Sequence, residues 1–259
     1  MRDTPGMSAS ALHQKWLANA RRQRVDPAVI DALIDRRRIG PGSFVVLASM
    51  IELADPHGAS YFLLPADTTA VQARAAVLAT YLLNAGTGYG ARGGHTDFAP
   101  AGYSVGELAR IADRQWANRW SYRAVRPVLA SAGALATTPN GILMGLAGSR
   151  MHTRFARRGG TTYGDLFMAN LDHRLGAEWQ LRTIIESGRM WYRGDGAPVR
   201  GGLDLDRVLH HEERHCRQWA RLGPVRMAAG YLGAEARARC SGGVNRFEVE
   251  AGLSDGGYR

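Results

Sequence analysis

The chain has 259 residues, of which 45% are hydrophobic and 22% charged, and its formal net charge is +10. This composition excludes a wholly disordered chain, and the length suits one large domain or two small ones. The two cysteines, Cys216 and Cys240, are too few to staple a domain of this size with disulfides.

The positive charge comes almost entirely from arginine, because Lys15 is the only lysine. Such a balance is typical of proteins with a polyanionic partner, either nucleic acid or an acidic membrane surface. It is also typical of GC-rich coding sequences, which favour alanine and glycine as well, and both are abundant here. The arginines are scattered along the chain, which favours the compositional explanation.

The opening residues, MRDTPGMSASALHQKW, are polar and lack the pattern of a secretory signal. The most apolar stretches fall short of the roughly 20 residues that span a bilayer. One of them, 76–85, is too short, and the other, 128–148, is interrupted by Pro139 and Asn140. We therefore expect no transmembrane segment and a cytoplasmic protein by default, with export by a signal-independent route as the alternative.

Two short helices are predicted near the start of the chain, over 8–23 and 26–38. Asp26 is a favourable N-cap for the second helix, and Pro27 suits its first helical position. The next segment, 43–54, is apolar, and its pattern fits either a helix or a buried strand.

The strongest helix of the first half is predicted over 66–86, capped by Asp67 or Thr68 and ended by Gly86. The glycine-rich loop that follows, 86–95, is preceded by a helix and lacks the GK[ST] sequence of a phosphate-binding loop. This context argues against nucleotide binding there.

Another amphipathic helix is predicted over 104–120, with Leu108 and Ile111 facing the core. Trp116 and Trp120 are expected to complete the core. The alternative is a nucleic-acid surface that combines the two tryptophans with arginines of the same helix. These arginines are Arg110, Arg114 and Arg119.

The composition becomes polar, basic and glycine-rich near 145–160. We therefore predict a helical domain of unknown role over 1–148, a linker or loop over 149–160 and a second domain over 161–259. The second domain is expected to begin with a β segment at 161–170, followed by a helix at 178–188. The expected fold is mainly α, of the α+β class.

The segment HHEERHCRQW, 210–219, lies on a helix predicted over 203–223. His211 and His215 are four residues apart, so both imidazoles lie on one side of a helix and can reach one metal ion. Glu212 lies about 100° round from His211, where it can deprotonate a water molecule without being a ligand. This H-E-x-x-H arrangement predicts Zn²⁺ with Glu212 as general base, and the alternative is a solvated helix face.

A catalytic zinc takes three protein ligands, so the third must come from elsewhere. The best source is NRFEVEAGLSDGG, 245–257, because Glu248 projects early from a helix that opens near Asn245. Glu248 is therefore the chosen ligand and Glu250 the reserve, while a surface role for Glu248 is the alternative. The weaker candidates for the third ligand are His173 and Asp165.

Several residues are expected to assist the metal and its ligands. Asp255 is a candidate hydrogen-bond partner for a ligand histidine. Cys216 points about 100° away from His215, which favours a buried free thiol over a ligand. The candidate donors to a tetrahedral intermediate, between which the sequence does not decide, are Tyr163, Tyr231, Tyr258 and His173.

The segments VLHHEERHCRQWARLGP, YLG and NRFEVEAGLSDGGY resemble the zincin-type metallopeptidases, specifically the branch with a glutamate ligand. They also resemble short actinobacterial proteins that carry HExxHxxQxA and NxFExxAGL segments. The resemblance covers about 160–259, and Gly252 stands where that branch has an aspartate. It implies a zincin-like domain, zinc held by the two histidines and Glu248, and a β segment at 161–168 that pairs with an extended peptide.

Three functions follow from these patterns. The first is a zinc-dependent metallopeptidase or related hydrolase that acts on a peptide or protein. The second is a basic nucleic-acid-binding protein. The third is a catalytically inactive zincin-like module in which the metal or the histidines hold the fold.

Overall fold

The computed structural model describes residues 7–90, 95–146, 160–169, 175–190 and 203–258. Its centre is a six-stranded sheet with the strand order β1-β2-β3-β4-β6-β5, in which β4 and β6 are parallel and the other neighbours antiparallel. The strands are β1 (Ile51–Ala54), β2 (Ser60–Leu63), β3 (Ala134–Thr137), β4 (Leu143–Leu146), β5 (Gly160–Tyr163) and β6 (Leu166–Ala169). A two-stranded sheet joins β7 (Arg189–Met190) to β8 (Leu203–Asp204).

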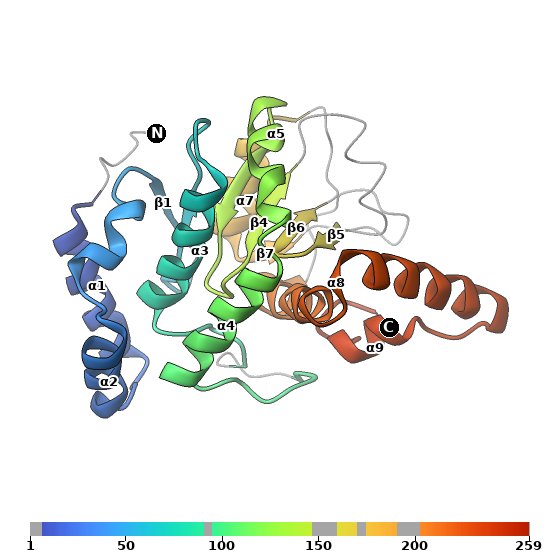
Figure 1. Ribbon diagram of the computed structural model, residues 1–259, viewed down its shortest axis with the longest axis horizontal. Helices are drawn as coiled ribbons and strands as arrows, with labels where there is room; N and C mark the ends of the chain where they lie inside the picture. The colour runs from blue at the N-terminus through green and yellow to red at the C-terminus, as the bar shows by residue number, and fades with distance from the viewer. Residues whose placement is uncertain (1–6, 91–94, 147–159, 170–174, 191–202, 259) are drawn as a thin grey trace.

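Helices lie on both faces of the central sheet (Figure 1). The α-helices are α1 (Ala9–Arg22), α2 (Pro27–Arg37), α3 (Ala70–Asn84), α4 (Val105–Ala117), α5 (Val125–Ala130), α7 (Ala177–Ser187), α8 (Leu205–Ser241) and α9 (Arg246–Ala251). Two 3-10 helices, η1 (Pro41–Leu47) and η2 (Ser121–Ala124), precede β1 and α5. The α+β class expected from the sequence is therefore confirmed.

The two faces of the sheet are covered by different helices because successive side chains of a strand point to opposite sides. In β3, Ala134 and Ala136 pack with α7 and the first turns of α8. Leu135, between them, packs with α3, η2 and α5 on the other face. The helix α8 therefore lies against the opposite face from α3 and α5.

Local capping explains why several helices begin where the sequence predicts. The side chains of Ser8, Asp26 and Ser104 accept hydrogen bonds from backbone N–H groups of the first turns of α1, α2 and α4. Helix α3 begins later than predicted, since Thr69 and Gln72 form its capping box and neither Asp67 nor Thr68 is the cap.

The prediction of a helical first half is wrong in part, because β1 to β4 all come from residues 51–146. The apolar segment 43–54 divides into the end of η1 and the whole of β1. The apolar stretch 128–148 contains the β3–β4 hairpin. Short, fully buried strands of four residues carry no alternation of polar and apolar side chains, so periodicity does not separate them from helices.

The expected linker, 149–160, lies outside the described residues except for Gly160. Strands from both sides of it belong to one sheet, because β4 pairs with β6 from Leu143 opposite Leu166 to Leu146 opposite Ala169. No helix among the described residues is both long and apolar enough to cross a membrane.

The helix α8 is bent where the sequence predicts its end. Gly223 has φ 73° and ψ 168°, which interrupts the helix, and Pro224 opens a further helical segment up to Ser241. This second segment was not predicted. It projects from the sheet (Figure 1). Its Met227 and Ala234 pack in a small separate core with Trp219 of the first segment of α8 and Phe247 of α9.

Candidate metal centre

Helix α8 brings the two predicted histidine ligands together. Asp204 caps the helix by accepting hydrogen bonds from the N–H groups of Asp206 and Arg207. One turn apart, His211 and His215 are 2% and 7% exposed, and their Nε2 atoms lie 3.1 Å from each other. The rings are nearly perpendicular, at 88°, and both Nε2 atoms lie close to Oε2 of Glu248.

Helix α9 adds the predicted third ligand from the other side. Asn245 caps α9 by accepting a hydrogen bond from Phe247 N, and Glu248 follows in the first turn. The Oε2 atom of Glu248 lies 3.2 Å from His211 Nε2 and 3.3 Å from His215 Nε2. One donor atom from each residue lies within 4.8 Å of the other two, and all three residues are buried.

The outer ring nitrogens of both histidines are held by neighbours. His211 Nδ1 lies 2.8 Å from the carbonyl oxygen of Gly252, and His215 Nδ1 lies 2.8 Å from Gln218 Oε1. Each Nδ1 therefore donates its proton to an oxygen, which leaves Nε2 as the nitrogen that faces Glu248. Gln218 itself is oriented by α9, because its Nε2 donates to Phe247 O at 2.9 Å.

Asp255, expected as the partner of a ligand histidine, has a different role. Its buried carboxylate accepts hydrogen bonds from Arg207 Nε at 2.9 Å and from the hydroxyl of Tyr89. The backbone carbonyl of Gly252 takes the expected place beside His211. Every residue has a backbone carbonyl, so the sequence could not indicate that the carbonyl of Gly252 contacts His211.

Tyr231, expected as a donor to a tetrahedral intermediate, lies beside Glu248. Its hydroxyl donates a hydrogen bond to Glu248 Oε1, the carboxylate oxygen that does not face the histidines. Burial and the charge of Glu248 both raise the pKa of Tyr231 well above its ordinary value. The phenol therefore stays protonated and fixes the carboxylate from the projecting part of α8.

The cluster is electrostatically coupled. Burial alone would lower the pKa of His215, but its hydrogen bond to Glu248 and the charge of that carboxylate raise the pKa to about 9. Burial would likewise raise the pKa of Glu248, but the hydrogen bonds from His211 and His215 hold it well below its ordinary value. The site thus stabilises a concentration of positive charge next to an ionised carboxylate.

The predicted general base, Glu212, belongs to α8 and contacts β5 at the edge of the sheet. Glu212 is partly buried, and its Oε2 accepts a hydrogen bond of 2.6 Å from Thr162 Oγ1. Thr162 belongs to β5, the end strand of the sheet, and its carbonyl accepts from Trp219 Nε1 at 2.8 Å. The charge of Glu212 contributes to the raised pKa of His215, after burial and the contacts of His215 with Glu248.

The remaining candidates lie at different distances from the cluster. Tyr258 is near it, with its ring centroid 5.9 Å from that of His211. Tyr163 of β5 packs against Trp219, at 6.1 Å between ring centroids. His173 lies outside the described residues.

The two alternative third ligands, Glu250 and Asp165, lie outside the histidine cluster, so the prediction that either is a ligand is wrong. Glu250 is half exposed on α9 and forms an ion pair with Arg221 at 3.0 Å. Asp165 is fully buried against Arg114 Nε, at 3.1 Å. Cys216 is a buried free thiol, as expected.

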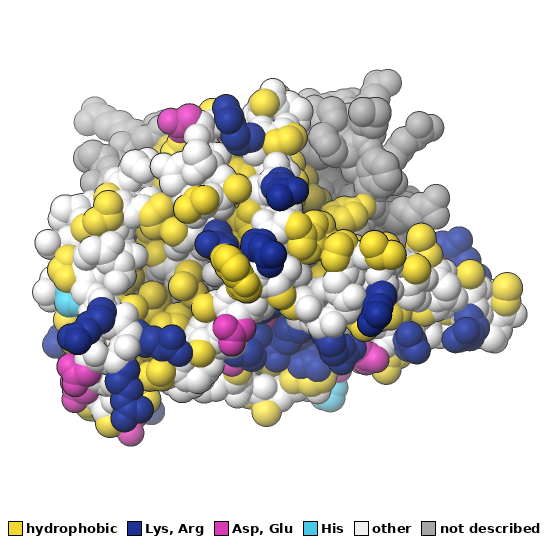
Figure 2. Space-filling view, in the orientation of Figure 1, with side chains coloured by type: hydrophobic (Ala, Val, Ile, Leu, Met, Phe, Trp, Pro, Cys, Tyr) yellow, Lys and Arg dark blue, Asp and Glu magenta, His cyan; other side chains and the backbone are white. Residues whose placement is uncertain are grey.

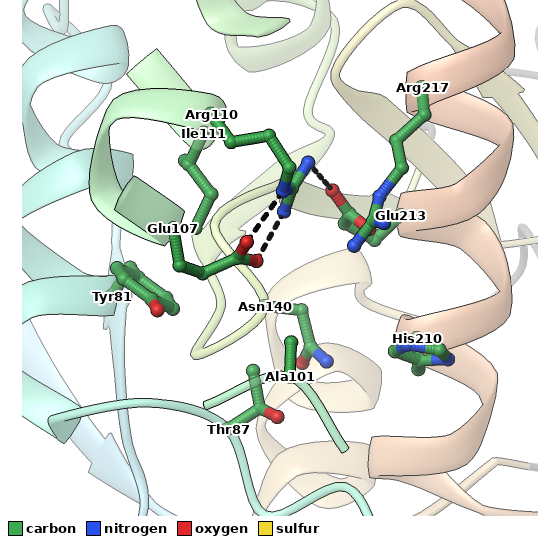
Figure 3. Close-up of a pocket in the computed structure, with 10 residues that line it drawn as sticks. All are labelled: Tyr81, Thr87, Ala101, Glu107, Arg110, Ile111, Asn140, His210, Glu213 and Arg217. Atoms are coloured by element: carbon green, nitrogen blue, oxygen red, sulfur yellow. Dashed lines mark hydrogen bonds and ion pairs between the residues drawn. The ribbon is translucent and has the colours of Figure 1, made fainter. Parts of the chain in front are cut away.

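A network of ion pairs fixes α8 against α4 (Figure 3). Arg110 Nη2 lies 2.7 Å from Glu107 Oε1, and its Nη1 lies 3.0 Å from Glu213 Oε1. Buried Arg114 and the half-exposed Arg217 also pair with Glu213. The arginines lower the pKa of Glu213 to about 2, although burial opposes this shift.

This network lies beside a cavity of about 20 Å³, which has room for about one water molecule. The cavity is lined from α8 by His210, Glu213 and Arg217. These residues share one side of the helix, and His211 and His215 lie on another. The cavity is therefore distinct from the histidine cluster. Arg114, which the alternative interpretation of α4 assigned to a nucleic-acid surface, is buried in the interior.

A scan of protein-family models, a search of curated proteins and a search of solved structures each found no match for this chain.

Proposed function

We propose that the chain is a zinc-dependent hydrolase that cleaves a peptide bond. The observation that supports this most directly is the convergence of two imidazole nitrogens and one carboxylate oxygen at a buried point. Two nitrogens and one oxygen are the donor set of many catalytic zinc sites, which leave further coordination positions for water and substrate. The residues present therefore fit a zinc ion, held by His211, His215 and Glu248.

When bound, the ion supplies Lewis acidity, which makes a water molecule more acidic and a carbonyl group more electrophilic. The chain supplies the other parts. Glu212 accepts the proton of the attacking water on its carboxylate and delivers it to the leaving nitrogen. Thr162 holds one oxygen of Glu212 by hydrogen bond, so that the carboxylate keeps one orientation.

A peptide substrate is proposed because β5 is the end strand of the sheet and runs beside α8. Among the described residues its strand partner is β6, on one side only. An extended peptide can bind at such an edge through main-chain hydrogen bonds. The substrate would then lie next to Glu212, because Thr162 joins this strand to the general base.

The test compares two variants of neighbouring carboxylates on a peptide library read by mass spectrometry. Glu212→Gln is expected to keep zinc and to lose hydrolysis by a factor of at least about 100, because general base catalysis contributes about 10²–10⁴-fold. Glu250→Gln, which changes an exposed glutamate outside the cluster, is expected to keep both. Retained hydrolysis in Glu212→Gln would count against the proposed mechanism.

The same assay, together with thermal melting, distinguishes the proposed hydrolase from a catalytically inactive module with a structural metal. A chain that binds zinc and melts at a lower temperature after chelation, but cuts no member of the library, would have a metal with a structural role only. The hydrolase proposal would then be rejected, although the metal site would stand.

A further inference from the structure

The C-terminal end of α4 carries an exposed tryptophan. The side chain of Trp116 is 60% exposed, although the sequence predicts it in the core. Two guanidinium groups lie over its ring, with Cζ of Arg119 at 4.7 Å and Cζ of Arg74 at 5.2 Å from the centroid. Cation–π contacts restrict these long side chains and fix them around the indole.

Two more arginines extend this feature along η2 and α5. Arg123 and Arg126 are exposed and follow Arg119 at intervals of four and three residues. Arg119 lies in the turn after α4, Arg123 in η2 and Arg126 in the first turn of α5, so the three follow one another closely along the chain. Figure 2 shows Lys and Arg side chains rising along the middle of this face, over the region of α4 and α5.

The chain segment that carries Arg119, Arg123 and Arg126 contains no acidic residue. The sequence has no Asp or Glu between Asp113 and Asp165, and α3 has none at all. Asp165 is buried and paired with Arg114, so it does not reach the surface. Within the part of the chain that the structure describes, no ion pair involves any of the four arginines. They are Arg74, Arg119, Arg123 and Arg126.

We propose that this basic–aromatic patch, made of Trp116 and the four arginines, binds single-stranded nucleic acid. A row of uncompensated guanidinium groups matches the repeated phosphates of one strand. Unpaired bases can stack on the indole or on guanidinium planes held against it. An acidic peptide would match the charge but would have no use for the tryptophan.

The patch lies apart from the proposed metal site. Its residues belong to α3, α4, η2, α5 and the turn after α4, whereas the metal ligands belong to α8 and α9. Binding of nucleic acid therefore does not depend on zinc. This inference goes beyond the proposed hydrolase function and can fail or succeed independently of it.

The charge test compares two double variants on the full chain. Arg123→Glu with Arg126→Glu changes the patch, and Arg226→Glu with Arg237→Glu makes the same change in net charge on exposed sites of α8. The probe is a labelled single-stranded oligonucleotide of mixed sequence, measured by fluorescence anisotropy over a range of salt concentrations. The patch variant is expected to raise Kd at least about tenfold and to lower the salt slope by about 1.4, for two lost phosphate contacts. The α8 variant is expected to change both much less.

The tryptophan test separates nucleic acid from other polyanions. Trp116→Ala is expected to raise Kd for the oligonucleotide about five- to 150-fold and Trp116→Phe to restore most of the affinity. Binding of polyglutamate or of anionic lipid vesicles should be weaker than that of the oligonucleotide in the wild type. Equal losses in the two double variants, an unchanged Kd in Trp116→Ala, or tighter binding to polyglutamate or vesicles would each overturn the proposal.

Discussion

At the scale of single residues, the proposed site depends on groups that orient the ligands. Gln218 accepts a hydrogen bond from His215 Nδ1 and donates one to Phe247 O, so it ties a ligand helix to α9. Partners of this kind typically contribute about 10–100-fold to metal affinity. We expect Gln218→Leu to weaken zinc binding by that factor in a competition titration with a chromophoric chelator.

The control for Gln218→Leu is Glu250→Ala. This change removes the long 3.4 Å contact from Gln218 Nε2 to Glu250 Oε2 but leaves the amide on His215. Its zinc affinity should match the wild type. Equal affinity in Gln218→Leu and the wild type would show that the amide does not position His215.

Glu213 provides a prediction on pH dependence. Its pKa falls from an ordinary value of 4.5 to about 2 in the folded chain. A lowered pKa stabilises the fold above pH 4.5, and this contribution is lost as the pH falls from 4.5 towards 2. The shift corresponds to about 3 kcal/mol. Glu213→Gln should therefore lower the free energy of unfolding by about that amount at pH 7.

The measurement for Glu213 is urea unfolding of both chains between pH 2 and pH 7. The difference in stability between the wild type and Glu213→Gln should shrink steadily below pH 4.5, because the wild-type carboxylate then becomes protonated. A difference that stays constant down to pH 2 would contradict the assignment of Glu213 as the ionised centre of the arginine network.

Some residues of the candidate site could be predicted from the sequence, and others could not. The histidine spacing and the cap at Asn245 were sufficient to select His211, His215 and Glu248, because short-range helix geometry decides both. Gln218 lies one turn after His215, so the same geometry would have found it. Gly252 acts through its backbone carbonyl, and no side-chain pattern could indicate it.

At the scale of elements, the bend in α8 connects the two parts of the proposed site. Gly223 has φ 73° and ψ 168°, a combination that is nearly restricted to glycine. The helical segment after Gly223 carries Tyr231 and brings its hydroxyl within hydrogen-bonding distance of Glu248. We expect Gly223→Ala to lower the free energy of unfolding by about 1–3 kcal/mol through backbone strain.

Gly233 is the matched control for Gly223, because an added Cβ meets no atom within 4 Å at either position. Gly233 lies inside the second segment of α8 without a positive φ. Gly233→Ala should therefore stabilise the chain by about 0.5–1 kcal/mol through helix propensity. If both variants changed the free energy of unfolding equally in urea unfolding, backbone strain in Gly223→Ala would be excluded as the reason for its loss of stability.

Elements also differ in how well the sequence predicted them. The apolar pattern of α1, the cap at Asp26 and the amphipathic pattern of α4 placed three helices correctly, since these signals are local. The order of the strands was not predictable, because β4 and β6 meet only through contacts between distant segments. The prediction that Trp116 lies in the core was wrong, because helical periodicity does not show whether another element covers the end of α4.

At the scale of the whole molecule, the zinc proposal predicts coupling between the metal and stability. A ligand at 100 times its Kd stabilises a protein by about 2.7 kcal/mol. For a chain of this size, removal of the ion should lower Tm by about 5–10 °C. The double variant His211→Ala with His215→Ala should show no shift with chelator in differential scanning calorimetry, and an unchanged shift in that variant would place the ion elsewhere.

The most direct test of the metal centre is the zinc content of three purified chains, measured by elemental mass spectrometry after dialysis against metal-free buffer. The wild type and Glu250→Gln should each retain about one zinc ion per chain, because three ligands remain in both. Glu248→Gln should retain almost none. A wild type without zinc, or equal zinc in Glu248→Gln and Glu250→Gln, would contradict the proposed site.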